Sequence, residues 1–212
     1  MLPPFDPERE RDPWTWESSR VVYDNPWIAL EERRGANPQG RPALYGIVRM
    51  KRLAVGVLPI DADGAVHLVG QWRPPLARYS WEMPEGGAED GESAEHTARR
   101  ELEEEAGLRA GRLEQILELD LSNSTTDERA VLYLATGLEP GRKAPEDTEV
   151  LAHARLHFQD VLAAVCSGAI RDAMTVAAVL RAHHMALSGA LPAALAQAMA
   201  ARAGMLAQGE RA

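Results

Sequence analysis

The feature that most constrains this chain is the stretch of residues 86–108, which reads GGAEDGESAEHTARRELEEEAGL. It begins with turn and cap residues, of which Asp90 and Ser93 are both candidate helix N-caps. Residues 94–106 then contain no glycine or proline and are mostly good helix formers. Gly107 follows at a position where glycine commonly ends a helix. The stretch therefore predicts a loop, a helix over residues 94–106 and a glycine stop.

Three carboxylates share one face of this predicted helix, because Glu101, Glu104 and Glu105 follow the spacing i, i+3, i+4. Like charges at this spacing destabilise a helix by about 0.2–0.5 kcal/mol per pair. A bound divalent cation would offset the repulsion, since magnesium and manganese prefer oxygen ligands. The alternative is a solvated acidic face without a ligand. An apolar stripe suited to packing on a sheet lies beside the glutamates and comprises Ala94, Ala98 and Leu102.

The same stretch carries the full pattern of the Nudix box. Its fixed positions are Gly86, Glu92 and residues 100–102, 104–105 and 107–108, with the family's spacing between them. The chain therefore resembles the Nudix hydrolases, which cleave nucleoside diphosphates linked to another moiety. The resemblance implies an α/β/α sandwich with a mixed β-sheet, an N-terminal strand extension and C-terminal helices.

The resemblance also implies roles for residues of the box. The glutamates that bind metal in the family, Mg²⁺ or Mn²⁺, match Glu101, Glu104 and Glu105. The resemblance also implies that Glu104 and Arg100 are catalytic residues. Arg100 resembles the arginine that orients the neighbouring glutamates. Glu92 resembles an accessory acidic position that is more often structural. Gly86 lies where a backbone carbonyl can reach a metal, with a plain strand-to-helix turn as the alternative.

Two segments before the box resemble the ADP-ribose pyrophosphatase branch, GQWRPPL at residues 70–76 and SWEMPEGG at residues 80–87. Arg73 resembles the arginine that contacts the diphosphate, a task that suits bidentate pairing by a guanidinium. Its alternative is a surface arginine at the end of a strand. Glu82 lies at the edge of the site in this branch, in reach of metal or substrate. Two departures bear on the exact substrate: residues 122–124 read SNS where the branch has a proline, and EGG replaces the usual Ala-Gly after Pro84.

Two aromatic residues, Trp27 and Tyr45, match positions that sandwich the adenine in this branch. A ring stacked on a nucleobase contributes about 1–3 kcal/mol. Packing in a core or an interface is the alternative for an aromatic residue in a strand. In the branch the N-terminal strands cross to a second subunit, so the resemblance implies a two-fold homodimer.

Hydrolysis also needs a group that takes a proton from the attacking water. The branch places this glutamate on a late loop, where Glu146 is the first candidate, narrowly ahead of Glu149. Glu128 is a further candidate that could instead contact the substrate. For each of them the alternative is a solvated acid in a loop.

Composition limits the partners and the cellular compartment that this chain can have. The net charge of −9 argues against a nucleic-acid partner. The single cysteine, Cys166, allows no intrachain disulfide, which fits a reducing cytoplasm, and its apolar helical context predicts a buried thiol. No apolar run is long enough to span a membrane, and the N-terminus has no signal-peptide core.

The remaining sequence predicts the order of elements. Strands are expected over residues 19–33 (two, around a turn at 24–26), 44–50, 54–59, 66–72, 114–121, 130–138 and 151–158. The sequence DADG at residues 61–64 predicts a hairpin turn, and helices are expected over 161–187 and 193–206. We expect residues 1–43 to form a dimerising arm and strands, 44–187 the Nudix domain, and 188–212 a helical tail.

The predicted function is metal-dependent hydrolysis of the diphosphate bond of a nucleoside diphosphate sugar, most simply ADP-ribose to AMP and ribose 5-phosphate. Other diphosphate sugars such as GDP-mannose, or nucleoside triphosphates, are alternatives within the class. A non-catalytic ADP-ribose sensor is an alternative of another class, although the intact box favours the enzyme.

Overall fold

The computed structural model describes residues 6–7, 10–144 and 150–201. The chain divides into two units, residues 1–51 with 120–128, and residues 52–119 with 129–212. The predicted division into an arm (residues 1–43), a Nudix domain (44–187) and a tail (188–212) stays a prediction. The two units group residues by contacts and do not test it.

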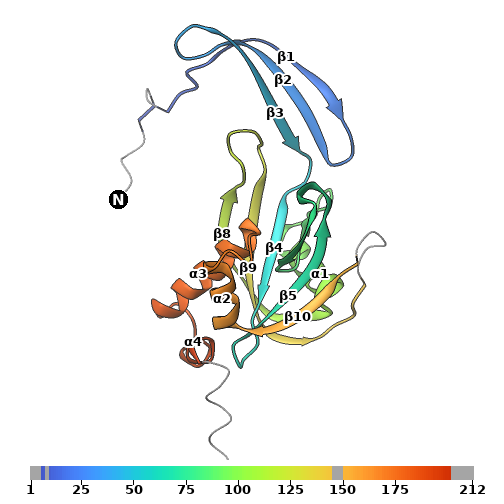
Figure 1. The fold of residues 1–212 in the computed structure, drawn as a ribbon, viewed down its shortest axis with the longest axis vertical. Helices are drawn as coiled ribbons and strands as arrows, with labels where there is room; N and C mark the ends of the chain where they lie inside the picture. Colours follow the sequence, from blue (N-terminus) through green and yellow to red (C-terminus); the bar gives the residue numbers. More distant parts are fainter. Residues whose placement is uncertain (1–5, 8–9, 145–149, 202–212) are drawn as a thin grey trace, which may run out of the picture. The chain divides into compact units, whose positions relative to one another are not determined.

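The first unit is an antiparallel sheet of three strands in the order β1 (Thr15–Asp24), β2 (Ile28–Ala36) and β3 (Pro42–Met50) (Figure 1). The predicted turn at residues 24–26 is confirmed, because the Asn25 side chain accepts hydrogen bonds from the backbone N–H groups of Trp27 and Ile28, each at 2.8 Å. Residues 120–128 join this unit through β3, where the Val48 N–H donates to the Thr125 carbonyl at 2.8 Å.

The second unit contains a mixed sheet and an antiparallel sheet. The mixed sheet has the order β7 (Glu85–Gly87), β4 (Ala54–Pro59), β9 (Arg129–Pro140) and β8 (Leu108–Asp120), with β4 and β9 parallel. The antiparallel sheet has the order β10 (Ala152–His157), β5 (Ala65–Arg73) and β6 (Arg78–Glu82), and a short 3-10 turn, η1 (Pro74–Leu76), follows β5.

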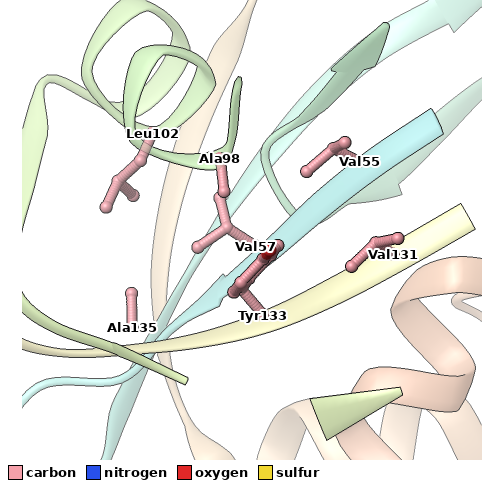
Figure 2. Close-up of a cluster of buried hydrophobic side chains, with 7 residues drawn as sticks. All are labelled: Val55, Val57, Ala98, Leu102, Val131, Tyr133 and Ala135. Carbon is pink, nitrogen blue, oxygen red and sulfur yellow. The ribbon is translucent and has the colours of Figure 1, made fainter. Parts of the chain in front are cut away.

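Helices cover both faces of the mixed sheet, because side chains alternate along β4. Val55 and Val57 pack against Ala98 and Leu102 of α1 (Ala94–Ala106), as Figure 2 shows. Gly56 faces the other way, where a Cβ would lie 3.0 Å from the Met174 Cε of α3 (Ala173–Leu187). This arrangement of helix, sheet and helix is the predicted α/β/α sandwich.

The structure corrects three predictions. Residues 161–187 are not one helix, because α2 (Phe158–Cys166) ends before α3 begins and Gly168 adopts a left-handed φ of 75° between them. The turn at residues 61–64 forms, but β4 and β5 then diverge into different sheets and share a single bridge between Ile60 and Val66. Cys166 is exposed rather than buried, because the buried positions of α2 are Phe158, Val161 and Val165.

The tail beyond α3 forms α4 (Ala193–Ala200), and the rest of its predicted helix lies outside the described residues. Among the described helices, none is long and apolar enough to cross a membrane.

Candidate active site

Helix α1 has the boundaries that its caps dictate. Ser93, not Asp90, is the N-cap, and its side chain accepts a hydrogen bond from the His96 N–H at 3.2 Å. At the other end Gly107 has a φ of 67°, and its N–H donates to the Glu103 carbonyl at 3.0 Å. These caps fix the two ends of the helix, and the spacing of Glu101, Glu104 and Glu105 within it puts the three glutamates on one face.

Arg100 connects the acidic residues of the box. Its guanidinium donates to Glu101 Oε1 at 2.8 Å and to Glu104 Oε2 at 2.9 Å. It also donates to Glu92 Oε1 at 3.1 Å and to the Gly87 carbonyl at 3.2 Å. The bond to Arg100 is the main cause that lowers the pKa of Glu92 from 4.5 to about 2. Glu92 is therefore tied into the loop before the helix, in line with a structural role.

The backbone of β7 lies directly against the acidic face of α1. A Cβ on Gly86 would lie only 2.0 Å from Glu101 Oε1, so no side chain fits at this position without a shift. The Glu85 N–H donates to Glu105 Oε2 at 2.9 Å. Glu105 is 1% exposed, whereas the Glu104 side chain is 34% exposed. Solvent exposure therefore increases along this face from the buried Glu105 to the partly exposed Glu104, and the backbone of Gly86 lies beside it.

This donor set fits a hard divalent cation. Glu101, Glu104 and Glu105 supply carboxylate oxygens, and glycine at position 86 lets the backbone approach where a Cβ would collide with Glu101. Metals of this type take oxygen ligands and keep several waters, which an open position such as that of Glu104 allows.

A second polar group surrounds Arg73. The Arg73 Nη2 donates to Glu82 Oε2 at 2.6 Å and to Glu85 Oε1 at 3.0 Å. Oxygens of Glu82, Glu85 and Asp172 all lie within 4.8 Å of one another. Burial, and after it the charges of Asp172 and Glu82, raises the pKa of Glu85 well above its usual value. The two predicted residues of the segments before the box, Arg73 and Glu82, are thus in direct contact.

Sequence reasoning did not single out Glu85 or Asp172 as site residues. The only signal for Glu85 was the departure from Ala-Gly after Pro84. Asp172 caps α3 by accepting from the Thr175 N–H at 2.7 Å. Thr175 in turn accepts from the Met83 N–H at 2.9 Å, which fixes α3 beside the strand that carries Glu82.

The other predicted residues are not placed relative to this group. Glu146 and Glu149 lie outside the described residues. Trp27, Tyr45 and Glu128 belong to the first unit. Trp27 is 63% exposed, and the Tyr45 hydroxyl donates to the Ser124 carbonyl at 2.6 Å. Burial raises the pKa of Glu128.

Comparison with known proteins agrees with this geometry. The NUDIX domain family matches residues 50–176, and the chain belongs to the Nudix family. It is 37% identical to an ADP-ribose pyrophosphatase of Bacillus subtilis (strain 168), over 67% of this chain and 77% of that protein. An ADP-ribose pyrophosphatase of Mycobacterium tuberculosis (strain ATCC 25618 / H37Rv) is 35% identical over 82% of this chain and 86% of its own.

The fold agrees as well. A crystal structure of an ADP compounds hydrolase superposes with a TM-score of 0.75 at 21% identity, covering 83% of this chain and 95% of that one. The predicted family, branch resemblance and fold class are therefore confirmed.

Proposed function

We propose that this protein hydrolyses the diphosphate bond of a nucleoside diphosphate sugar, with ADP-ribose as the first candidate and AMP and ribose 5-phosphate as products. The observation that carries the proposal is the contact of the Gly86 backbone with an acidic helical face that Arg100 organises. Relatives that cover most of the chain and are named ADP-ribose pyrophosphatases support the substrate.

Glu101, Glu104, Glu105 and the Gly86 carbonyl would hold Mg²⁺ or Mn²⁺. When bound, such a cation neutralises diphosphate charge and lowers the pKa of a water. Arg100 keeps the carboxylates of Glu101 and Glu104 in place through its two hydrogen bonds. This chain therefore supplies the preorganised charge against which the diphosphate is bound.

Arg73 would pair with the diphosphate through its guanidinium, with Glu82 holding it in position at the edge of the site. A water oxygen attacks one phosphorus, the phosphorus–oxygen bond to the other phosphate breaks, and a carboxylate takes the proton of the water. Glu146 remains the first candidate for this carboxylate, ahead of Glu149, and Glu128 remains a further one.

The proposal includes a homodimer in which Trp27 and Tyr45 help to bind the adenine. Support comes from the exposure of Trp27 and from further exposed apolar side chains in the first unit, Val21, Val22, Tyr23 and Leu44. Large exposed apolar side chains on a small sheet are typical of an interaction surface. A cytoplasmic location, expected from the single cysteine, stays part of the proposal.

The test is product analysis after incubation of the purified protein with Mg²⁺ and ADP-ribose, GDP-mannose, diadenosine compounds or nucleoside triphosphates. We expect AMP from ADP-ribose, with a loss of more than about a hundredfold in Glu104→Gln, since the substitution removes a charged ligand. Glu103→Gln is the matched control, because Glu103 is the neighbouring glutamate and accepts from the Arg142 N–H instead.

The outcomes separate the alternatives. Turnover of another compound alone would keep the hydrolase and reject ADP-ribose and the adenine pocket. Binding of ADP-ribose without turnover of any compound would favour a sensor. Equal activity of Glu104→Gln and the parent protein would reject the proposed metal site.

A further inference from the structure

The second unit contains a hollow that the proposed reaction does not use. It has a volume of about 250 Å³ and lies between β6 and the connection from α2 to α3. Its lining residues are Arg78, Tyr79, Ser80, Gly168, Ala169 and Arg171. One water occupies about 30 Å³ in the liquid, so the hollow has room for a ligand of several heavy atoms.

The connection that forms one wall is held in place by its own hydrogen bond. Gly168 has a φ of 75°, a conformation that favours glycine, and its carbonyl accepts from the Arg171 Nε at 2.8 Å. The bond places Arg171 across from the strand that carries Arg78 and Ser80. This wall is therefore a turn that the hydrogen bond between Arg171 and Gly168 closes.

The hollow has two positively charged residues in its lining, Arg78 and Arg171. Within the part of the chain that the structure describes, neither Arg78 nor Arg171 forms an ion pair with a carboxylate. By contrast, Arg73, Arg100 and Arg155 each pair with at least two carboxylates. The chain has 32 acidic and 23 basic residues, so acidic partners are plentiful. Two arginines without a carboxylate partner therefore line the same hollow, whereas Arg73, Arg100 and Arg155 are neutralised by theirs.

A hydroxyl donor, that of Ser80, accompanies the two arginines. Ser80 is only 8% exposed and lines the hollow, and no described residue accepts a hydrogen bond from its hydroxyl. Tyr79, between Arg78 and Ser80 on β6, borders the hollow as well. Guanidinium and hydroxyl groups are the donors that bind phosphate oxygens, and a guanidinium binds two of them at once.

We propose that this hollow is a phosphate-binding subsite, which takes orthophosphate or the phosphate monoester group of a larger molecule. Bound phosphate would offset the repulsion between Arg78 and Arg171 and give the Ser80 hydroxyl an acceptor. The site is separate from the acidic face of α1, since none of its lining residues belongs to the box.

The subsite adjoins the group around Arg73. Arg78, Ser80 and Glu82 lie at alternate positions of β6 and so share a face, within about 13 Å along the strand. Arg171 precedes Asp172, whose carboxylate lies beside Glu82 and Glu85. The phosphate can therefore come from two sources: an additional phosphate on a substrate bound at the proposed active site, or free phosphate in solution. The first source rests on the proposed function.

The first experiment measures binding without turnover. Orthophosphate is titrated into the full-length protein by calorimetry, and its effect on the melting temperature is compared with chloride at equal ionic strength. We expect Arg78→Ala to weaken phosphate binding at least about tenfold and Arg78→Lys to weaken it less, since lysine keeps the charge but loses the fork. Arg129→Ala, which removes an exposed arginine of β9, should bind like the parent protein.

The second experiment separates the two sources by steady-state kinetics with ADP-ribose and with ADP-ribose that carries a 2′-phosphate. If the substrate supplies the phosphate, Arg78→Ala raises KM at least about tenfold for the phosphorylated compound only. If free phosphate is the ligand, orthophosphate binding is lost while the ratio of the two KM values stays constant. Either result supports the subsite, and the binding result stands even when no compound is turned over.

The proposal is overturned if the parent protein binds no phosphate and does not distinguish the two substrates, or if Arg78→Ala behaves like the parent in both experiments. Should Arg78→Ala fail to fold, as judged by circular dichroism, Arg171→Ala replaces it, because Arg171 is exposed on a connection and is held only through a backbone carbonyl. The same outcomes then apply.

Discussion

Arg100 shows how one residue can organise a charged site without being a metal ligand. It touches three carboxylates and a backbone carbonyl. Lysine would keep the positive charge but could not reach these acceptors together, because an ammonium group lacks the planar fork of a guanidinium. The contribution of Arg100 is therefore geometric as well as electrostatic.

We predict that Arg100→Lys weakens the apparent affinity for Mg²⁺ by about 10- to 100-fold, the usual effect of losing a residue that orients metal ligands. The measurement is a magnesium titration of the activity, with circular dichroism to establish that the helix is retained. Arg99→Lys is the matched control, since Arg99 pairs with Glu95 on the same helix. An unchanged magnesium titration for Arg100→Lys would contradict the role assigned to this residue.

Gly86 provides a second residue-scale prediction. A methyl group at this position would lie 2.0 Å from Glu101 Oε1, so Gly86→Ala must displace either the backbone of β7 or the carboxylate. We expect Mg²⁺ affinity to fall by at least about tenfold, because the ligands lose their spacing. Gly46→Ala is the control, since nothing lies within 4 Å of a Cβ there. Equal magnesium binding by Gly86→Ala and Gly46→Ala would refute the proposed approach of the backbone to the metal.

The limit of sequence reasoning at this scale is visible in Glu85 and Asp172. The box residues could be found because they follow one another on a single helix, where spacing determines the face. Glu85 and Asp172 meet only because α3 packs beside the strand that carries Glu82, through the bond from Met83 to Thr175. No local pattern encodes a contact between residues so far apart in the chain.

Among the elements, those with strong end signals were predicted best. The boundaries of α1 agree with the prediction because a serine cap and a glycine stop enclose a run of helix formers. The break between α2 and α3 was missed because apolar residues continue at helical spacing across it, although Gly168 was a signal for a stop. The pairing of β4 was also missed, since a tight turn does not determine whether its flanking strands stay in one sheet.

The stability of the sheet in the first unit should depend on pH through the ionisation of Glu31. This β2 residue accepts from Ser19 of β1 and from Arg49 of β3, each at 2.6 Å. Bonds from Arg33, Ser19 and Arg49 lower its pKa from 4.5 to about 2. Because the pKa is lower in the folded state, the stabilisation is present above about pH 4.5 and is lost as the pH falls toward 2.

We therefore predict that Glu31→Gln lowers the free energy of unfolding by about 1 kcal/mol at pH 7, a value discounted for partial solvent screening. The difference from the parent protein should shrink between pH 5 and pH 2. Urea unfolding followed by tryptophan fluorescence measures it. Glu17→Gln changes an exposed glutamate of β1 and should have little effect. A difference that stays constant over this pH range would rule out the ion-pair explanation.

At the scale of the whole molecule, the first unit presents more apolar surface than a three-stranded sheet can cover by itself. Val21, Tyr23, Trp27 and Leu44 are each more than half exposed. Small sheets of this kind are marginally stable alone, and large exposed apolar side chains favour association. A second copy of the chain is the partner that the proposed function requires, because it would complete an adenine pocket with Trp27 and Tyr45.

We predict that the protein is a dimer at micromolar concentration and that Leu44→Asp raises the dimer dissociation constant at least about a hundredfold, because a carboxylate would be buried without a partner. Analytical ultracentrifugation over a range of concentrations measures this constant. Leu180→Asp is the control, since Leu180 is 45% exposed on α3 in the second unit. If the adenine pocket is shared, KM for ADP-ribose should rise as Leu44→Asp dissociates and recover at high protein concentration. The parent protein could instead sediment as a monomer at every concentration and hydrolyse ADP-ribose with a KM that does not depend on protein concentration. That result would show that one chain forms the complete site.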